Sequence, residues 1–416
     1  MLRGICKKVI AYMTLGIDVS RLFTDMMMAI ETKDMVVKKM VYLYLCTYAQ
    51  KEPELAIMCI NTLRRDCDNE DPMVRGVALR SMCGLKLESI LEYVELPLKK
   101  GLVDISAYVR RTAVMGVLKV NYVNSTMIET NNFIATLYKM LYDVDTHVVT
   151  NVIYVLNELH LLEGGLTLNT SLLMHLLNRI GEFSEWGLNA ILDLVCRYQP
   201  SNEDEIYAIM NLLDPVLRTT NSGAVLATIK CFLHVTADMP ELHEQIYTRT
   251  KPSLLTFVTG GQPEVQYSIL KHLHIILRRT AAKGIYDEEY RQLYVRYNEP
   301  PHVKHLKVSL LPLLANTTNA NDISMELNEY VTDIDTELST CALYALSEIA
   351  TSVDSHCVEI TQKLVEFIDI DIPHVRNISV ICLGNILRIY PGMCIHVLPS
   401  ISRCLRKVDN NASKVV

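Results

Sequence analysis

The chain has 416 residues, half of them apolar, with 16 glycines, 14 prolines and a formal net charge of −7. This length exceeds what one hydrophobic core usually organises, so we expect several domains or a repeat array, and the scarcity of turn-forming residues argues against a β-rich fold. The acidic balance argues against a general nucleic-acid-binding protein, whose surface would be strongly basic.

The first forty residues differ in charge from the rest of the chain. They hold seven Lys and Arg against four Asp and Glu, a balance of +3, which leaves −10 for the remainder. Solvated helix faces are the simpler interpretation of this excess. The alternative is a weak contact with acidic lipid headgroups, which is worth about 1 kcal/mol for each well-placed cation.

The stretch DPMVRGVALRSM, residues 71–82, is one copy of a pattern that recurs along the whole chain. In most copies a polar or proline-containing turn precedes an apolar index residue, and small or apolar residues follow three and four positions later. A second amphipathic segment, such as PELAIMCINTLRR (53–65) or NNFIATLYKMLYD (131–143), separates successive copies. The index residues recur every 35 to 40 positions: Val37, Val74, Val109, Val148, Leu188, Val225, Val265, Val303, Leu338 and Val375.

This period predicts an all-α protein, a right-handed α-solenoid of HEAT/armadillo-type repeats with about ten helix pairs. The acid or proline of each turn favours a helix start, and the apolar stripe of one repeat can be buried only against its neighbours. We expect residues 1–416 to form a single solenoid. Because neither end carries an atypical capping repeat, we also expect the trunk to be incomplete at both ends.

No residue constellation indicates catalysis, a cofactor or a metal. Twelve cysteines are scattered without a C-x-x-C pair or a signal peptide, which is typical of free thiols in a reducing compartment. His302 and His305 lie one helical turn apart, but two ligands without a nearby carboxylate or thiolate are weak evidence for a metal site. We therefore expect a cytosolic, non-enzymatic protein with at most a peripheral membrane contact, since no apolar run approaches the roughly 18 residues of a membrane span.

Residues 53–65 predict a helix that is apolar on two sides. Ile57 and Ile60 lie toward a different side from the stripe of Leu55, Met58, Cys59 and Leu63. Burial between the layers of the solenoid is the simpler interpretation of this pattern, and a surface that awaits a partner is the alternative. We expect Trp186, the one tryptophan, to pack in the core.

Four segments carry a resemblance to a known family. They are KKMVYLYLCTYAQKEPELAIMCINTLRRDC (38–67), DNEDPMVRGVALRSM (68–82), SEWGLNAILDLVCRYQP (184–200) and VRYNEPPHVKHLKVSLL (295–311). In this order they resemble the N-terminal trunk of β-adaptins, the large β subunits of adaptor-protein vesicle-coat complexes. DPMVRGVALRSMCGL (71–85) and LLNRIGEFSEWG (176–187) are most similar to the β subunit of the fourth adaptor complex.

The resemblance implies a large subunit that pairs with a second large adaptin, a medium subunit and a small subunit. Such a complex sorts cargo into vesicles at trans-Golgi and endosomal membranes, where an Arf-family GTPase recruits it. By the same resemblance, Ile57 and Ile60 match the GTPase contact, and Lys7 and Lys8 match a phosphoinositide contact. The hinge and appendage of the family are missing from this chain, so clathrin dependence and cargo stay open. A HEAT-repeat transport receptor of the importin-β type, or a phosphatase scaffold, is the alternative.

Overall fold

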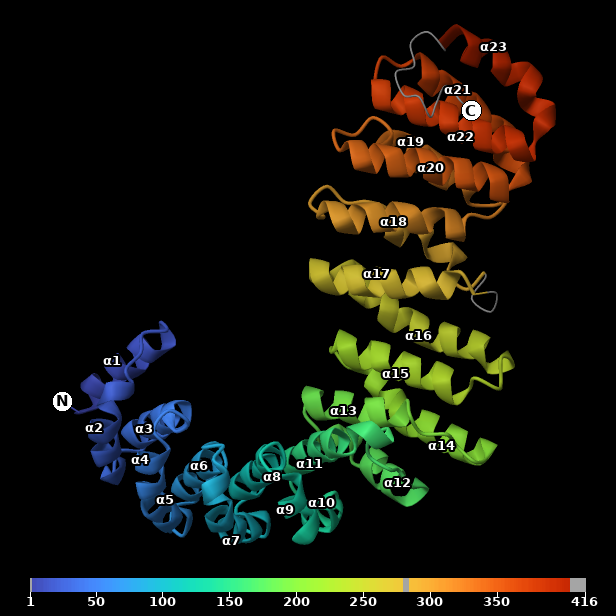
Figure 1. Cartoon of the computed structure of the whole chain (residues 1–416). Coiled ribbons are helices and arrows are strands. Elements are labelled where there is room, and N and C mark those ends of the chain that lie inside the picture. The colour runs from blue at the N-terminus through green and yellow to red at the C-terminus, as the bar shows by residue number, and fades with distance from the viewer. Residues whose placement is uncertain (1, 280–283, 405–416) are drawn as a thin grey trace. The chain divides into compact units, whose positions relative to one another are not determined.

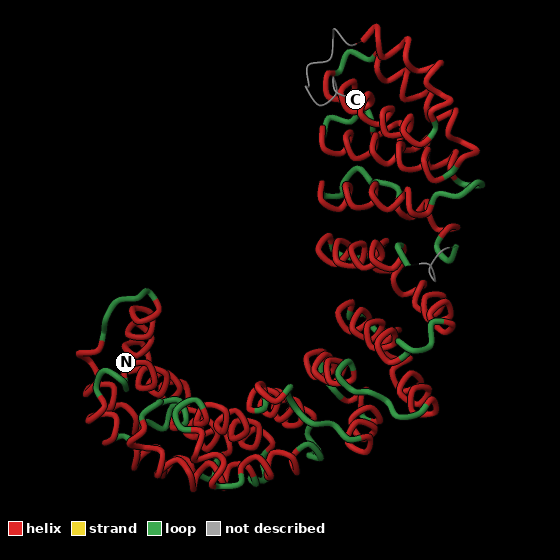
Figure 2. Tube along the Cα trace, turned by 45° about the vertical axis from the view of Figure 1, so that its right-hand side comes forward, coloured by secondary structure: helices red, strands yellow, loops and turns green. Residues whose placement is uncertain are grey.

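The computed structural model describes residues 2–279 and 284–404, and every regular element within those ranges is a helix (Figures 1 and 2). The prediction of an all-α, helical-repeat fold is confirmed. The chain separates into two compact units, residues 1–198 and residues 199–416, which are described here one at a time. That all 416 residues form one uninterrupted solenoid remains a prediction.

The first unit is a curved stack of helix pairs in two layers, preceded by α1 (Leu2–Thr14) and α2 (Phe23–Met28). The inner layer follows the inside of the curve in Figure 1 and consists of α3 (Met35–Tyr48), α6 (Pro72–Met82), α8 (Ala107–Asn121), α11 (Thr146–Leu159) and α13 (Glu185–Val195). The outer layer consists of α4 (Pro53–Met58), α5 (Ile60–Cys67), α7 (Leu91–Leu102), α9 (Ser125–Thr130), α10 (Phe133–Met140) and α12 (Thr170–Asn178).

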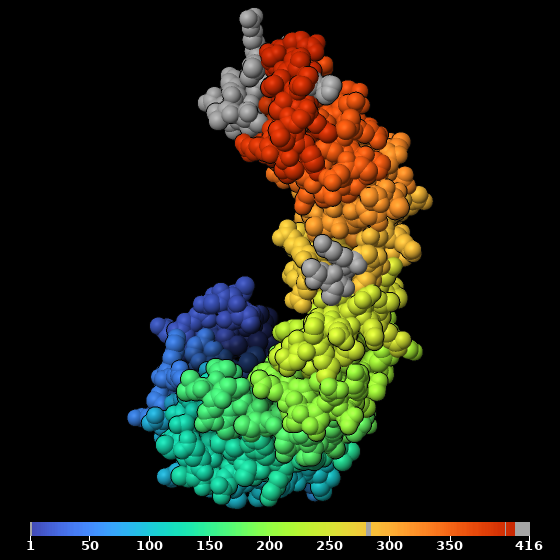
Figure 3. Space-filling model, turned by 90° about the vertical axis from the view of Figure 1, so that its right-hand side faces the viewer, coloured from blue at the N-terminus to red at the C-terminus, as the bar shows by residue number. Residues whose placement is uncertain are grey.

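The second unit repeats the two-layer arrangement, and its described atoms form a continuous body in the space-filling view (Figure 3). One layer consists of α15 (Ser222–Val235), α17 (Pro263–Leu277), α18 (Pro301–Leu314), α20 (Thr336–Ser352) and α22 (Pro373–Ile389). The other consists of α14 (Glu203–Leu213), α16 (Glu241–Gly260), α19 (Ala320–Tyr330), α21 (Cys357–Asp369) and α23 (Cys394–Cys404). A 3-10 segment, Asp287–Leu293, takes the place of an α-helix before α18.

The turn residues start the helices as their chemistry predicts. A side-chain oxygen of the residue before the helix accepts a hydrogen bond from a free backbone N–H of the first turn, which satisfies a donor that the helix itself cannot. Proline fills the first position of α4, α6, α17, α18 and α22, where its missing N–H does no harm, and α6 is also capped by an aspartate. The aspartates that cap in this way are Asp34, Asp71, Asp145 and Asp335.

Most index residues of the repeat lie in the core. Eight of the ten are buried, and Val74 and Val265 are half-buried. The second amphipathic segments are less regular than the index helices. In residues 131–143 the helix begins only at Phe133, because Asn132 adopts a left-handed backbone with a φ of 53°. The apolar stripe therefore fixes which faces pack together, and turn chemistry decides where the outer helices break.

Bidentate ion pairs along the turns link successive repeats of the first unit. The guanidinium of Arg75 donates to both carboxylate oxygens of Asp104 at 2.9 Å, and Arg110 donates to Asp143 at 2.8 and 2.9 Å. Each arginine also donates to two carbonyls of the turn before its own helix. The planar guanidinium donates two hydrogen bonds to one carboxylate and has further N–H donors for backbone carbonyls. One arginine side chain therefore stabilises the turn before its own helix and also binds the next repeat.

These pairs keep the two carboxylates ionised to low pH. Burial raises the pKa of Asp104 and of Asp143, but hydrogen bonds from the arginines and from the backbone N–H groups of Ser106 and Asp145 outweigh burial. The pKa of each aspartate therefore lies below the ordinary value of 3.8.

A buried ion pair joins the two layers within the first repeat. Lys38, which follows the index residue Val37, and Tyr42 both donate to the carboxylate of Asp66 in α5. All three side chains are buried. Burial, and then the hydrogen bond to Asp66, raise the pKa of Tyr42, so its hydroxyl remains a protonated donor. The two donors satisfy a carboxylate that would be costly to bury alone.

Candidate interaction surfaces

The predicted partner-binding helix is two short helices, α4 and α5, that meet at Cys59. The backbone N–H of Cys59 bonds to the carbonyl of Ala56 rather than to a residue four positions back, so the helix tightens at this point. Ile57 is 42% exposed and Met58 is 67% exposed. Together they form an exposed apolar pair at the end of α4, on the outer layer of the first unit.

The structure places Ile57 and Ile60 on different surfaces. Ile60 is 3% exposed and lies in the core with Ala56, Cys59 and Leu63. The sequence pattern grouped Met58 with Cys59 and Leu63 and grouped Ile60 with Ile57, and both groupings are wrong, because Met58 is exposed and Ile60 is buried. The core stripe runs through the small residue Ala56, which a pattern based on large apolar residues passes over. Only Ile57 of the predicted pair is available to a partner in this conformation, and its apolar neighbour on the surface is Met58.

Lys7 and Lys8 both lie exposed on α1. They are consecutive on a helix, so they point about 100° apart. Lys8 lies on the side of Ile5 and Tyr12, which are 52% and 49% exposed, and Lys7 lies toward Arg3. No described acidic side chain forms an ion pair with either lysine. A cation beside exposed apolar and aromatic groups is the composition that binds at a lipid interface.

Trp186 lies on the surface, not in the core as predicted. It is 77% exposed at the start of α13, and its backbone carbonyl accepts a hydrogen bond from the hydroxyl of Tyr154 on α11. The neighbouring Gly187 and Leu188 are buried instead. A Cβ on Gly187 would lie 2.6 Å from Oγ1 of Thr150, so the glycine allows α13 to approach α11 closely.

The structure gives the two histidines different partners. His305 Nε2 lies 3.0 Å from the carboxylate of Asp335 in the next helix pair, and His302 is exposed beside the ring of Tyr267. No group of three or more metal-ligating side chains occurs among the described residues. Five buried cysteines, Cys6, Cys59, Cys83, Cys357 and Cys382, form no disulfide. Burial raises the pKa of Cys83 to about 12, which makes this thiol unreactive.

None of the helices in the described ranges is long and apolar enough to cross a membrane.

Helix pairs stacked in two layers define a helical-repeat fold. The family model described as the Adaptin N terminal region matches residues 3–415, so the chain belongs to the adaptin N-terminal family.

Among its relatives are β-adaptins from plants and animals. The chain is 40% identical over 415 residues to "Beta-adaptin-like protein A" of Arabidopsis thaliana, and 34% identical over 412 residues to "AP-4 complex subunit beta-1" of Mus musculus. The two matches cover 96% and 99% of this chain but 49% and 55% of the relatives, so the chain spans about half their length. The resemblance to the β-adaptin trunk, including that of the fourth adaptor complex, is confirmed.

A structural comparison supports the same fold. A chain in the "Homology model of the full-length AP-3 complex in an intermediate open conformation" matches with a TM-score of 0.61 at 18% identity. The match covers 99% of this chain and 72% of the other chain. At this level of identity the similarity establishes the helical-solenoid fold alone.

Proposed function

We propose that this chain is the trunk of the large β subunit of a heterotetrameric adaptor complex. In this role it is a non-catalytic scaffold that pairs with a second large adaptin, a medium subunit and a small subunit, and supports cargo sorting and vesicle formation. The observation that carries the proposal is the family match over residues 3–415 to a two-layer helical stack. Such stacks offer extended surfaces on which several weak contacts add through effective concentration.

Affinity purification of the tagged chain from cells, followed by mass spectrometry, tests this proposal. We expect a medium and a small adaptin subunit and a second large adaptin to be recovered in similar amounts. Recovery of nuclear-transport proteins or of phosphatase subunits in their place would contradict the proposal and favour a different HEAT-repeat scaffold.

The proposed function includes recruitment by an Arf-family GTPase at the surface of α4. The support for this contact is the resemblance of residues 53–65 to the family's GTPase-binding helix and the exposure of Ile57 and Met58. Apolar pairs in the middle of a polar surface commonly form the centre of a protein interface. Ile60 would contribute indirectly, because its burial holds α5 against α6.

Two substitutions separate contact from folding. Ile57→Asp should abolish GTP-dependent recruitment to Golgi membranes while the complex still assembles, because the side chain is half outside the core. Ile60→Asp should instead unfold or destabilise the first unit, because it places an unpaired charge in the core. Membrane recruitment is measured by imaging, and assembly by co-purification. Normal recruitment of the Ile57→Asp chain would contradict the assigned contact.

Peripheral membrane contact through Lys7 and Lys8 is the second part of the proposed function, and it would place the complex on trans-Golgi and endosomal membranes. The chain carrying Lys7→Glu and Lys8→Glu should co-sediment less with vesicles that contain phosphatidylinositol 4-phosphate. The matched control carries Lys230→Glu and Lys271→Glu, the same charge change at two exposed lysines of the second unit. Equal loss in both variants would show a net-charge effect without a local site.

A further inference from the structure

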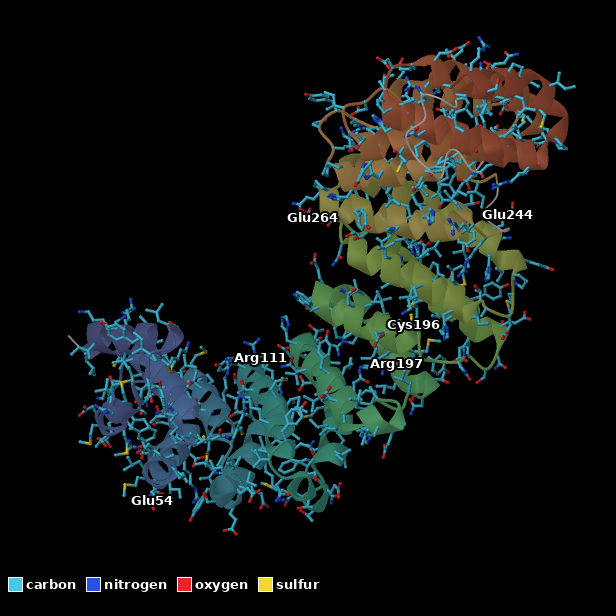
Figure 4. The ribbon with its side chains drawn as sticks, turned by 45° about the horizontal axis from the view of Figure 1, so that its top comes forward. Glu54, Arg111, Cys196, Arg197, Glu244 and Glu264 are labelled. Atoms are coloured by element: carbon cyan, nitrogen blue, oxygen red, sulfur yellow. The ribbon has the colours of Figure 1, made fainter. Side chains whose placement is uncertain are left out.

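The inner layer of the first unit contains a groove that no part of the proposed function uses. Two adjoining hollows of about 480 and 380 Å³ share Arg80, Tyr108 and Lys119 and together cross α3, α6, α8 and α11. We call them the inner groove. Five cations line it: Lys39, Arg80, Lys86, Arg111 and Lys119. Figure 4 shows Arg111 on the inner side of the unit, opposite Glu54 of the outer layer.

Helical spacing explains why these residues gather on one face. Lys39, Leu43 and Cys46 lie three or four positions apart on α3, and so do residues 108, 111, 112, 115 and 119 of α8. Residues with this spacing share one side of a helix. That side faces away from the outer layer, so the stacking of repeats aligns the stripes of four helices into one continuous surface.

The cations of the inner groove lack acidic partners. None of the five forms an ion pair with a described acidic side chain, and no Asp or Glu lines either hollow. Their sequence neighbours behave differently: Lys38 and Arg110, which directly precede Lys39 and Arg111, are each paired with an aspartate. Positive charge without compensation in a concave surface focuses the field and attracts anions.

The groove also offers apolar contacts between its cations. The ring of Tyr108 lies over Gly76, where a Cβ would come within 2.3 Å of the ring, and the guanidinium of Arg111 lies 5.1 Å from the centre of the same ring. Leu43 and Met115 are 51% and 38% exposed along the groove. Cations alternating with apolar side chains complement a ligand that alternates carboxylates with apolar groups.

We propose that the inner groove binds an acidic peptide segment of a partner protein in an extended conformation. Helices in contact lie about 8 to 10 Å apart, so four of them span about 24 to 30 Å. An extended chain of about seven to nine residues covers this distance. Carboxylates of the segment pair with Arg80, Arg111 and Lys119, and its apolar side chains contact Leu43 and Met115.

A protein ligand fits the groove better than a membrane does. Four of the five cations lie on inner-layer helices, and Lys86 lies in the turn after α6. This layer follows the inside of the first unit's curve (Figure 1), which a flat bilayer cannot follow. The cations are also spread over several helices, whereas a single phosphorylated headgroup needs its cations in one compact cluster. An extended peptide is narrow enough to enter a concave surface. Its charges are spaced along its length, so they can reach cations on several helices.

Fluorescence polarisation with the full chain tests the proposal. The probe is a fluorescein-labelled ten-residue peptide of alternating glutamate and tyrosine, and the matched peptide has glutamine at each glutamate position. The chain should bind the glutamate peptide at least tenfold more tightly than the glutamine peptide, and the difference should shrink as salt rises, because charge attraction is screened. No binding of the glutamate peptide, or equal binding of both, overturns the proposal.

Charge reversal locates the binding. Arg80→Glu with Arg111→Glu should weaken the glutamate peptide at least tenfold, whereas the control Arg64→Glu with Lys230→Glu, at exposed positions outside the groove, should leave it within about twofold. The milder Arg111→Gln serves if the double variant loses its helical circular dichroism. Unchanged affinity in the folded variants overturns the assignment. If the variants lose binding to vesicles with phosphatidylinositol 4-phosphate but keep the peptide, the groove is a lipid site and the proposal is wrong.

Discussion

Two arginines of the first unit and two cations of the second unit are held in different ways, although the units share one repeat pattern. In the first unit, Arg75 and Arg110 each reach from one repeat to an aspartate in the next, and their side chains are 18 to 19% exposed. The charges therefore lie at the edge of the stack, where water still reaches them. Such pairs stabilise the contact between repeats without a large desolvation cost.

Two cations of the second unit, Lys307 and Arg376, are more deeply buried and bond mainly to the turn before their own helix. Lys307 is 1% exposed and donates to the carboxylate of Glu299 and to the carbonyl of Tyr294. Arg376 is 6% exposed and donates to the carbonyls of Ile368 and Ile370. Burial lowers the pKa of Lys307, and the carboxylate of Glu299 counteracts this effect.

The difference shows that the helical repeat fixes the apolar stripe but not the charged positions beside it. How a cation at such a position is paired and buried varies from repeat to repeat. An exposed link between repeats contributes modestly and depends on pH. A buried, paired cation contributes little net stability. Removing the cation is nevertheless costly, because its acidic partner is then left buried without a counter-charge. Substitutions in the second unit should therefore have larger effects than the matched substitutions in the first.

Lys307→Ala should give the largest effect, a loss of about 3 to 5 kcal/mol, because it leaves the Glu299 carboxylate buried without its cation. Hydrogen exchange followed by mass spectrometry should report the loss in α18 and the preceding turn. The control Lys304→Ala removes a cation on the same helix that contacts only the exposed Tyr297 ring, and it should change stability by less than about 1 kcal/mol. Equal losses of stability in the two variants would show that burial of the ion pair of Lys307 with Glu299 does not determine the effect.

Arg110→Ala should destabilise the first unit by about 1.5 to 3 kcal/mol, the value typical of a hydrogen-bonded charged group. The loss should appear as faster exchange in both α8 and α11, because Arg110 links the two repeats. Arg111→Ala, one position along, removes a cation without an acidic partner and should cost less. A double-mutant cycle with Asp143→Ala isolates the pair, and a coupling energy near zero would contradict the link between repeats.

Low pH should reduce the stabilisation that the ion pair of Arg110 with Asp143 provides. The pKa of Asp143 is lowered in the folded chain, so its contribution is present above about pH 4 and is lost as the pH falls through the folded value. The difference in unfolding free energy between the original chain and Arg110→Ala should therefore shrink between pH 6 and pH 3, as measured by denaturant-dependent hydrogen exchange. A constant difference would mean that the guanidinium stabilises the turns through its carbonyl contacts alone.

Trp186→Ala should have the smallest effect on stability, within about 0.5 kcal/mol, because 77% of the side chain is already exposed. Phe133→Ala, which truncates an aromatic ring that is 1% exposed in the same unit, should cost about 3 to 5 kcal/mol. Thermal unfolding of the two variants side by side is the measurement. A large loss of stability in Trp186→Ala would contradict the surface position of this side chain and favour the core position expected from the sequence.

The fold could be predicted from the sequence to a large extent, and the candidate sites only in part. Helix starts at Asp34, Asp71, Asp145 and Asp335 follow from local chemistry, which needs no knowledge of distant residues. The mistakes concern single side chains near the boundary of the apolar stripe: Met58 lies outside the core stripe to which the pattern assigned it, Ile60 joins that stripe, and Trp186 lies on the surface. Successive residues on a helix point about 100° apart. If the predicted apolar stripe is displaced by one residue, buried side chains are therefore predicted to be exposed and exposed ones to be buried.

The inner groove could not be predicted from the sequence because its cations come from three helices in successive repeats and from the turn after α6. Each of them, taken alone, resembles an ordinary solvated Lys or Arg. A weak signal was present in the spacing of Tyr108, Arg111 and Met115 on one helix face, but nothing in the sequence says which cations lack partners.

The sequence by itself determined that this protein is a stack of helix pairs of the adaptin type, because a repeated apolar stripe and its capping turns act within one or two repeats. Only the tertiary structure decided which charges are paired between repeats and which face a groove without acids. That decision depends on distances between side chains about 30 to 40 residues apart, set by the packing of one helix pair on the next.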